Sequence, residues 1–174
     1  MPIKEQFRYR HDLPRRGWAL IDTLDHGTAN FTCENCGNVH IRYKHLLENR
    51  KTGKRVLVGC VCAEHLTQDF TTPKLRERNL RGWMGRRMRF PTLNWVWSHN
   101  GNLRLKKDGK IFVLKRGPYG GWAASYLPRD RGEWIQVPGW HDKAEDAKLA
   151  LFDAVYARDG VNTSVVAIEG VQRK

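Results

Sequence analysis

The sequence contains no hydrophobic run that could cross a membrane. Its uninterrupted stretches of small or apolar residues, such as the one from Val56 to Ala63, all fall short of the length of a transmembrane helix, which needs about 18 such residues. The N-terminal segment MPIKEQFRYRH carries three lysines and arginines and lacks an apolar core, so a secretory signal is not expected. We therefore expect a cytoplasmic protein with no membrane partner.

Acidic residues are scarce in the middle of the chain. Residues 71–140 hold fifteen lysines and arginines against four aspartates and glutamates, so eleven of the thirteen net positive charges lie there. A concentrated basic field attracts polyanions. The hydrophobic fraction of 40% and the aromatic fraction of 10% are too high for a disordered basic tail. The composition therefore predicts a folded protein that binds nucleic acid.

Cysteine is also rare, and its few positions are clustered. The four cysteines form two close pairs, Cys33-Glu-Asn-Cys36 and Cys60-Val-Cys62. Clustered cysteines in a cytoplasmic protein indicate metal binding rather than disulfides. Four thiolates would hold one Zn²⁺ ion in a closed tetrahedral site with a structural role.

The fourth zinc ligand has an alternative. His65 lies in the first turn of a short helix expected over residues 61–69 and could replace Cys60 as a ligand. We favour four cysteines, because a thiol at Cys60 otherwise has no evident role.

The residues between the two cysteine pairs predict a β-hairpin. Apolar and polar residues alternate over residues 39–44, residues 49–54 form the turn, and residues 55–58 form the return strand. A cysteine knuckle followed by a hairpin and a helix resembles a treble-clef or zinc-ribbon module. Such a ββα module would occupy residues 1–70 together with an N-terminal arm.

A basic linker helix is expected over residues 71–94. Thr72 can cap it, Pro73 suits the first helical position, and Pro91 ends it near Phe90. Apolar residues recur along one side of this helix. The other faces present six arginines that we expect to contact phosphates, namely Arg76, Arg78, Arg81, Arg86, Arg87 and Arg89.

The C-terminal part predicts an antiparallel sheet covered by one helix. Asp108-Gly109 is a strong hairpin turn, and the expected strands are residues 102–106, 111–115, 122–127 and 134–137. A final helix over residues 143–157, capped by Asp142, has a buried stripe of alanine, leucine and valine. We therefore expect an α+β fold with this module at residues 95–158 and a tail at 159–174.

The sequence of this module resembles a known family. Lys115-Arg116 leads through Pro118-Tyr119-Gly120 into Trp122-Ala123-Ala124, Trp134 lies on the next strand, and Ala144–Ala147 begin the helix. This order resembles the AP2-type DNA-binding domain, in which three antiparallel strands pack on one helix. The resemblance implies that the sheet lies in the DNA major groove. It also implies that Lys115, Arg116 and Trp122 contact DNA, with Trp134 as a further candidate.

The sequence thus favours a zinc-stabilised protein that binds nucleic acid, duplex DNA in particular, without catalytic activity. One alternative is a phage- or mobile-element-type adaptor or inhibitor that binds a protein partner in a nucleoprotein complex. A second alternative is a ββα-metal nuclease. In that enzyme His40 or His45 would activate water and His65 would hold a divalent cation.

Overall fold

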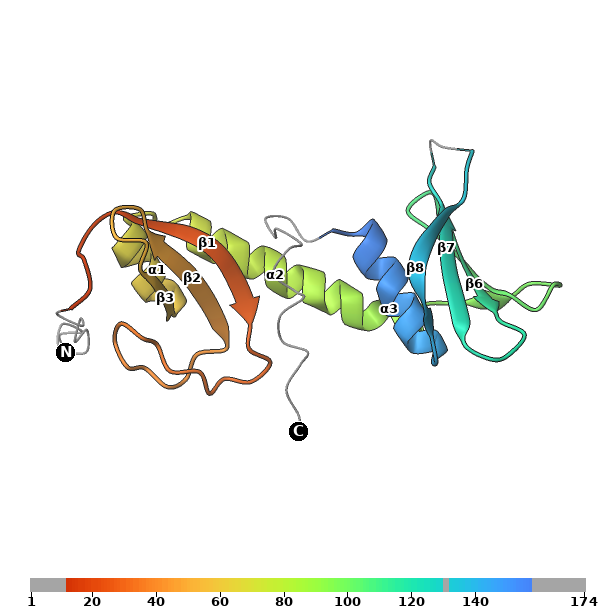
Figure 1. Cartoon of the computed structure of the whole chain (residues 1–174), viewed down its shortest axis with the longest axis horizontal. Coiled ribbons are helices and arrows are strands. Elements are labelled where there is room, and N and C mark those ends of the chain that lie inside the picture. Colours follow the sequence, from red (N-terminus) through yellow and green to blue (C-terminus); the bar gives the residue numbers. More distant parts are fainter. Residues whose placement is uncertain (1–11, 130–131, 158–174) are drawn as a thin grey trace. The chain divides into compact units, whose positions relative to one another are not determined.

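The computed structural model describes residues 12–129 and 132–157. The expected α+β class is confirmed: these residues form three α-helices, a three-stranded sheet and a five-stranded sheet (Figure 1). They group into two compact units, residues 12–82 (unit 1) and 83–157 (unit 2). The division falls within helix α2 (Thr72–Arg89), the helix expected as a linker. The expected tail and most of the N-terminal arm lie outside the described residues.

Unit 1 is built on an antiparallel sheet with the order β1-β2-β3. Its strands are β1 (Trp18–Asp25), β2 (Tyr43–Asn49) and β3 (Arg55–Val58), and helix α1 (Cys60–Thr67) follows directly after Gly59. Helix α1 packs against β1 and β2. The buried core of the unit contains Leu13, Trp18, Cys33, Leu47, Val56, Val58, Cys62, Ala63 and Leu66.

Strand β1 was not expected from the sequence, and its irregular pairing explains why. The register with β2 shifts between Leu20, which pairs with Leu47, and Asp22, which pairs with Leu46. This bulge adds one residue to β1 and interrupts the alternation of buried and exposed side chains. The period-2 signal that identifies a half-buried strand is therefore lost within a segment that is nevertheless paired along its length.

Unit 2 is an antiparallel meander with the order β4-β5-β6-β7-β8. After the short 3₁₀ helix η2 (Phe90–Thr92), the elements are β4 (Val96–Trp97), β5 (Leu103–Lys107), β6 (Lys110–Arg116), β7 (Trp122–Leu127), β8 (Ile135–His141) and α3 (Ala144–Val155). Helix α3 covers one face of the sheet, against β6, β7 and β8 (Figure 1). Four of these strands lie near their expected positions, and β4 adds a fifth.

Aromatic rings fill the core of unit 2. The ring of Phe90, only 1% exposed, lies 5.3 Å from the rings of both Phe112 and Phe152 and 5.7 Å from that of Trp95. These edge-to-face contacts join η2, the sheet and α3. Because Phe90 follows α2 directly, it fixes the end of that helix in the core of unit 2.

The predicted turn at Asp108-Gly109 is confirmed, whereas the two predicted helix caps are wrong. Asp108 and Gly109 have φ angles of 52° and 73°, as the hairpin prediction requires. The cap of α3 is Lys143 and makes no side-chain cap bond, so the expected cap at Asp142 is wrong. At α2, Asp69 accepts hydrogen bonds from the backbone N–H groups of Thr71 and Thr72 and replaces the expected Thr72 cap. None of the described helices is long and apolar enough to span a membrane.

Candidate functional site

A tight knuckle between β1 and β2 carries the first cysteine pair. The N–H of Cys33 donates to the carbonyl of Asn38 over 2.8 Å, and the N–H of Gly37 donates to the carbonyl of Cys33 over 2.9 Å. Gly37 has a φ of 74°, a left-handed conformation that glycine adopts without steric cost. The knuckle therefore depends on the glycine that directly follows Cys36.

The knuckle is held against β3 and the start of α1. The backbone N–H of Glu34 donates to the carbonyl of Leu57 over 3.1 Å, and the N–H of Leu57 donates to Glu34 Oε2 over 2.6 Å. The N–H of Gly59 points at Cys33 Sγ over 3.4 Å. These contacts bring the knuckle to the helix end that carries Cys62.

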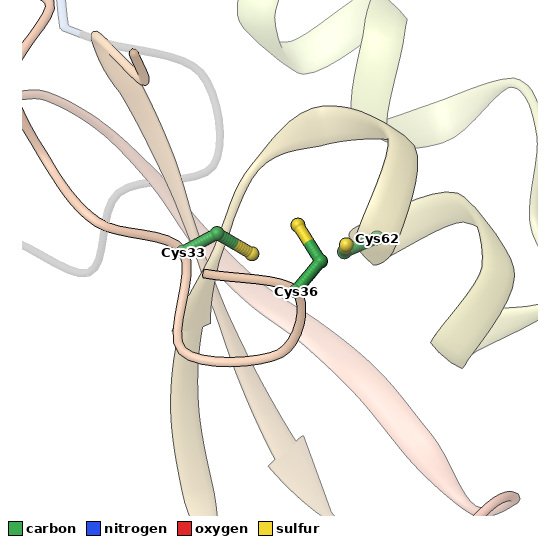
Figure 2. A group of neighbouring side chains, drawn as sticks. All are labelled: Cys33, Cys36 and Cys62. Carbon is green, nitrogen blue, oxygen red and sulfur yellow. The ribbon is translucent and has the colours of Figure 1, made fainter. Parts of the chain in front are cut away.

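Three cysteine sulfurs converge at this point. The Sγ atoms of Cys33, Cys36 and Cys62 all lie within 4.8 Å of one another, and Figure 2 shows them turned toward a common centre. Cys33 and Cys62 are buried and Cys36 is half-buried. This group could hold a metal ion.

The surroundings of Cys33 favour a thiolate. The Cys62 thiol beside it, together with backbone N–H groups of the knuckle and of Gly59, lowers the pKa of Cys33 to about 5 although burial opposes this shift. The hydrogen bond to Cys33 and burial raise the pKa of Cys62 in turn. The pair can therefore carry one thiolate, at Cys33, before any metal binds. This favours metal binding, because metal ligation requires the thiolate form.

Cys60 lies outside this group, and helix geometry explains why. Helix α1 begins at Cys60, so Cys60 and Cys62 are separated by two helical positions, about 200° around the axis. Their side chains therefore point to opposite sides of the helix. Of the four expected zinc ligands the structure brings together three, while Cys60 Sγ lies within 4.8 Å of ligand atoms of His45 and Glu77. His65, the alternative ligand, packs its ring edge-to-face against Phe70 at 5.6 Å.

Three of the six helix arginines already have protein partners. Arg76 donates to the carbonyl of Ile21 over 3.0 Å, and Arg81 forms an ion pair with Glu77 at 2.9 Å. Arg87 forms a two-pronged hydrogen bond to the carboxylate of Asp153 at 2.7 and 2.8 Å. Arg76 and Arg87 therefore hold α2 to other elements of units 1 and 2, whereas the ion pair of Arg81 lies within the helix.

The other three arginines are exposed. Arg89 donates to the carbonyl of Gly85 within its own helix. Within the described residues, the side chains of Arg78 and Arg86 make neither a hydrogen bond nor an ion pair, and both are exposed. These three positions remain open to an external anion.

The face of the unit 2 sheet opposite α3 is polar and basic. Strand pairing aligns Arg104 with Val113, Val113 with Ser125, and Ser125 with Gln136, which places these side chains in one row across four strands. Lys115 lies on the same face, two residues after Val113 in β6. We call this surface the open face.

The open face is hollowed. A depression of about 570 Å³ is lined by Ser98, Asn100, Asn102, Arg104, Val113, Lys115, Ser125, Trp134 and Gln136, none of which is acidic. The Nε of Arg104, one of the lining residues, is buried and has no hydrogen-bond partner among the described residues. Trp134 is 50% exposed. The hollow therefore combines two cations, several neutral hydrogen-bonding groups and an accessible aromatic ring.

Two of the residues implied by the family resemblance, Arg116 and Trp122, lie on the other side of the strands. Lys115 lines the hollow, whereas Arg116 is exposed with the opposite orientation in β6. Trp122 packs against the hydrophobic core of unit 2, with its ring 6.1 Å from that of Trp97. The open face instead presents three residues that the sequence analysis did not identify, namely Arg104, Ser125 and Gln136.

No protein-family model matches the chain, and no curated protein or solved structure matches it either. The resemblances to AP2-type and treble-clef modules therefore rest on the residues and the order of elements alone.

Proposed function

We propose that the protein binds nucleic acid, duplex DNA in particular, on the open face of the unit 2 sheet, without catalysing a reaction on it. The observation that carries the proposal is the buried Nε of Arg104, a charged donor without an acceptor. Leaving such a donor unpaired costs free energy. A phosphate in the hollow would pair with the guanidinium of Arg104, because arginine matches phosphate geometry well.

The other groups of the hollow support the same ligand. Lys115 adds a second cation, and no acidic side chain in the lining competes with a phosphate. Ser125 and Gln136 can hydrogen-bond to phosphates or to base edges. The half-exposed ring of Trp134 offers an apolar contact in the groove, for example to the methyl group of thymine.

The location of the hollow agrees with the family resemblance. In AP2-type domains the sheet, rather than the helix, meets the major groove, and here the hollow lies on the sheet face that α3 leaves uncovered. Arg78, Arg86 and Arg89 on α2 are exposed and can add phosphate contacts. Arg76 and Arg87 serve mainly to hold the helix in place, and Arg81 is paired with Glu77 of the same helix.

Equilibrium binding to a duplex of random sequence tests this function. We expect Arg104→Gln and Lys115→Ala each to weaken binding about tenfold, because each removes a charged phosphate contact. Lys110→Ala is the matched control, since Lys110 lies in the same strand with the opposite orientation, and it should change affinity much less.

Three outcomes would contradict the proposal. Equal affinities for wild type and both open-face variants would place any DNA contact elsewhere. Absence of DNA and RNA binding, with one protein partner co-purifying in its place, would favour the adaptor alternative. Cleavage of the duplex in the presence of Mg²⁺ would favour the nuclease alternative.

We further propose that the group of Cys33, Cys36 and Cys62 holds Zn²⁺ in a treble-clef-like module. Thiolates are preferred zinc ligands, and the backbone N–H groups directed at Cys33 stabilise its negative charge. Three thiolates leave the fourth tetrahedral position to a water molecule or another ligand. The zinc joins the knuckle to α1 and so closes the core of unit 1.

Removal of the metal tests this assignment. A zinc chelator should accelerate backbone hydrogen exchange in residues 12–82, because metal binding and folding are coupled in small metal modules. Residues 83–157 should keep their protection, because this unit contains no cysteine. Unchanged exchange in unit 1 after the zinc content has been shown to fall to zero would contradict the assignment.

A further inference from the structure

A second cluster of metal-ligating side chains lies in unit 1, outside the cysteine group. A ring nitrogen of His45, Cys60 Sγ and a carboxylate oxygen of Glu77 all lie within 4.8 Å of one another. They come from three different elements: β2, the first turn of α1 and the first half of α2. The cluster therefore joins segments that are far apart in the sequence.

The buried histidine is the strongest indication of a ligand. His45 is 0% exposed, and its Nε2 has no hydrogen-bond partner among the described residues. The nearest carboxylate oxygen, Glu77 Oε2, lies 3.6 Å away, which is too long for a hydrogen bond. Two ligands of one tetrahedral zinc ion, each about 2 Å from the metal, stand about 3.3 Å apart. The spacing thus fits an ion between the two side chains better than a direct contact.

His45 and Glu77 are each held in place by a hydrogen bond to a further residue, as metal ligands usually are. The hydroxyl of Thr23 lies 3.1 Å from His45 Nδ1, so Nδ1 can donate its proton to Thr23 and leave the Nε2 lone pair facing the cluster. Arg81 donates to Glu77 Oε1 over 2.9 Å, which leaves Oε2 directed at His45.

The charges of the cluster suit a divalent ion. A neutral imidazole, one thiolate and one carboxylate supply two negative charges. The neighbouring Glu64, whose Oε1 lies 3.9 Å from Cys60 Sγ, is paired with Lys74 at 2.9 Å and is therefore already compensated. A mixed set of nitrogen, sulfur and oxygen donors is typical of Zn²⁺.

We propose that His45, Cys60 and Glu77 form a second metal site, of the zinc type, that fastens the first half of α2 to the sheet of unit 1. This site gives a role to Cys60, which lies outside the group of Cys33, Cys36 and Cys62. It also explains how α2, which buries only Pro73 and Leu80, is held against the sheet of unit 1. The inference concerns different residues from the open face and does not depend on nucleic-acid binding.

Metal stoichiometry of the full-length protein tests the site. Wild type, loaded with Zn²⁺ and measured by native mass spectrometry, should carry two ions per chain, and Cys60→Ser and Glu77→Gln should each carry one. Glu48→Gln is the matched control: Glu48 lies in β2 and pairs with Arg55 at the surface, so two ions should remain. One ion in wild type, or two in Glu77→Gln, would overturn the proposal.

A spectroscopic measurement separates the second site from the first. Cys36→Ser should disrupt the cysteine group and leave one site, so Co²⁺ bound to this variant should show a thiolate-to-cobalt charge-transfer band. Adding Cys60→Ser should abolish this band, and adding Glu77→Gln should weaken Co²⁺ binding at least tenfold. If wild type holds one zinc ion and the single variant Cys60→Ser holds none, Cys60 belongs to the cysteine group and the second site does not exist.

Discussion

Asp108 connects the β5–β6 turn to the end of α3. It takes a left-handed φ of 52° in the turn, and its Oδ2 accepts a hydrogen bond of 2.6 Å from the hydroxyl of Tyr156. This bond, with smaller contributions from Lys107 and Lys110, holds the pKa of Asp108 below its usual value. A carboxyl with a lowered folded-state pKa stabilises the fold above its unfolded pKa of about 4, and this contribution is lost as the pH falls through the folded value.

Asp108→Asn tests this pH dependence. Asparagine tolerates the left-handed turn position, so the variant removes the charge and keeps the backbone. We expect unit 2 to lose about 0.5 kcal/mol of unfolding free energy at pH 7, a small value because the side chain is half exposed. The difference from wild type should shrink as the pH falls below about 4, the unfolded pKa of an aspartate.

Tryptophan fluorescence during urea unfolding provides the measurement, because six of the seven tryptophans lie in unit 2. Tyr156→Phe should also lower the unfolding free energy at pH 7, since it removes the hydrogen bond from the Tyr156 hydroxyl to the Asp108 carboxylate. A difference between wild type and Asp108→Asn that is equally large at pH 7 and pH 3 would contradict the account.

Among the elements, α2 carries both arginines that are paired within the protein and arginines that are exposed. The Arg87 side chain is 30% exposed, pairs with Asp153 and lies over the ring of Trp83 at 5.9 Å, whereas Arg86 is exposed and without such partners among the described residues. Neighbouring positions on one helix therefore have different roles, one in stability and the other in binding.

Single alanine substitutions should separate these roles. Arg87→Ala should lower the unfolding free energy of unit 2 by about 1 kcal/mol, because it removes a two-pronged ion pair and a ring contact. Arg86→Ala should change stability by less than about 0.5 kcal/mol and weaken DNA binding. Urea unfolding and DNA titration of both variants provide the measurement, and the reverse pattern would show that the roles are misassigned.

The elements also show what the sequence could and could not predict. Strands β5, β6 and β7 follow from alternation and from the Asp108-Gly109 turn. A two-residue turn also fixes the pairing of Arg104 with Val113, so the shared face of Arg104 and Lys115 was predictable from the sequence. The cluster of His45, Cys60 and Glu77 was not, because it depends on how α2 docks on the sheet.

The cysteine group was predictable in part. The spacing of Cys33 and Cys36 identifies a metal knuckle, and a helix start near the second pair supplies a further ligand. Whether Cys60 or Cys62 faces the knuckle depends on where α1 begins, and helix ends are the least certain part of any sequence-based assignment. A start at Cys60 directs only Cys62 to the group.

For the molecule as a whole, the distribution of positive charge is the main reason to expect nucleic-acid binding. The formal net charge is +13, and in unit 2 the cations Arg104 and Lys115 line the hollow on the open face. A general positive field would attract DNA to every basic surface alike. A defined site instead predicts that these two residues account for particular phosphate contacts.

The salt dependence of DNA binding distinguishes a defined site from general attraction. On duplex DNA each neutralised phosphate adds about −0.9 to the slope of log K against log salt concentration. The double variant Arg104→Gln/Lys115→Ala should therefore reduce the slope by about two units. Arg50→Gln/Lys51→Ala, which removes the same charge from the exposed β2–β3 turn, should leave the slope unchanged. Equal slopes for the two double variants would contradict the assignment of the open face as the nucleic-acid surface.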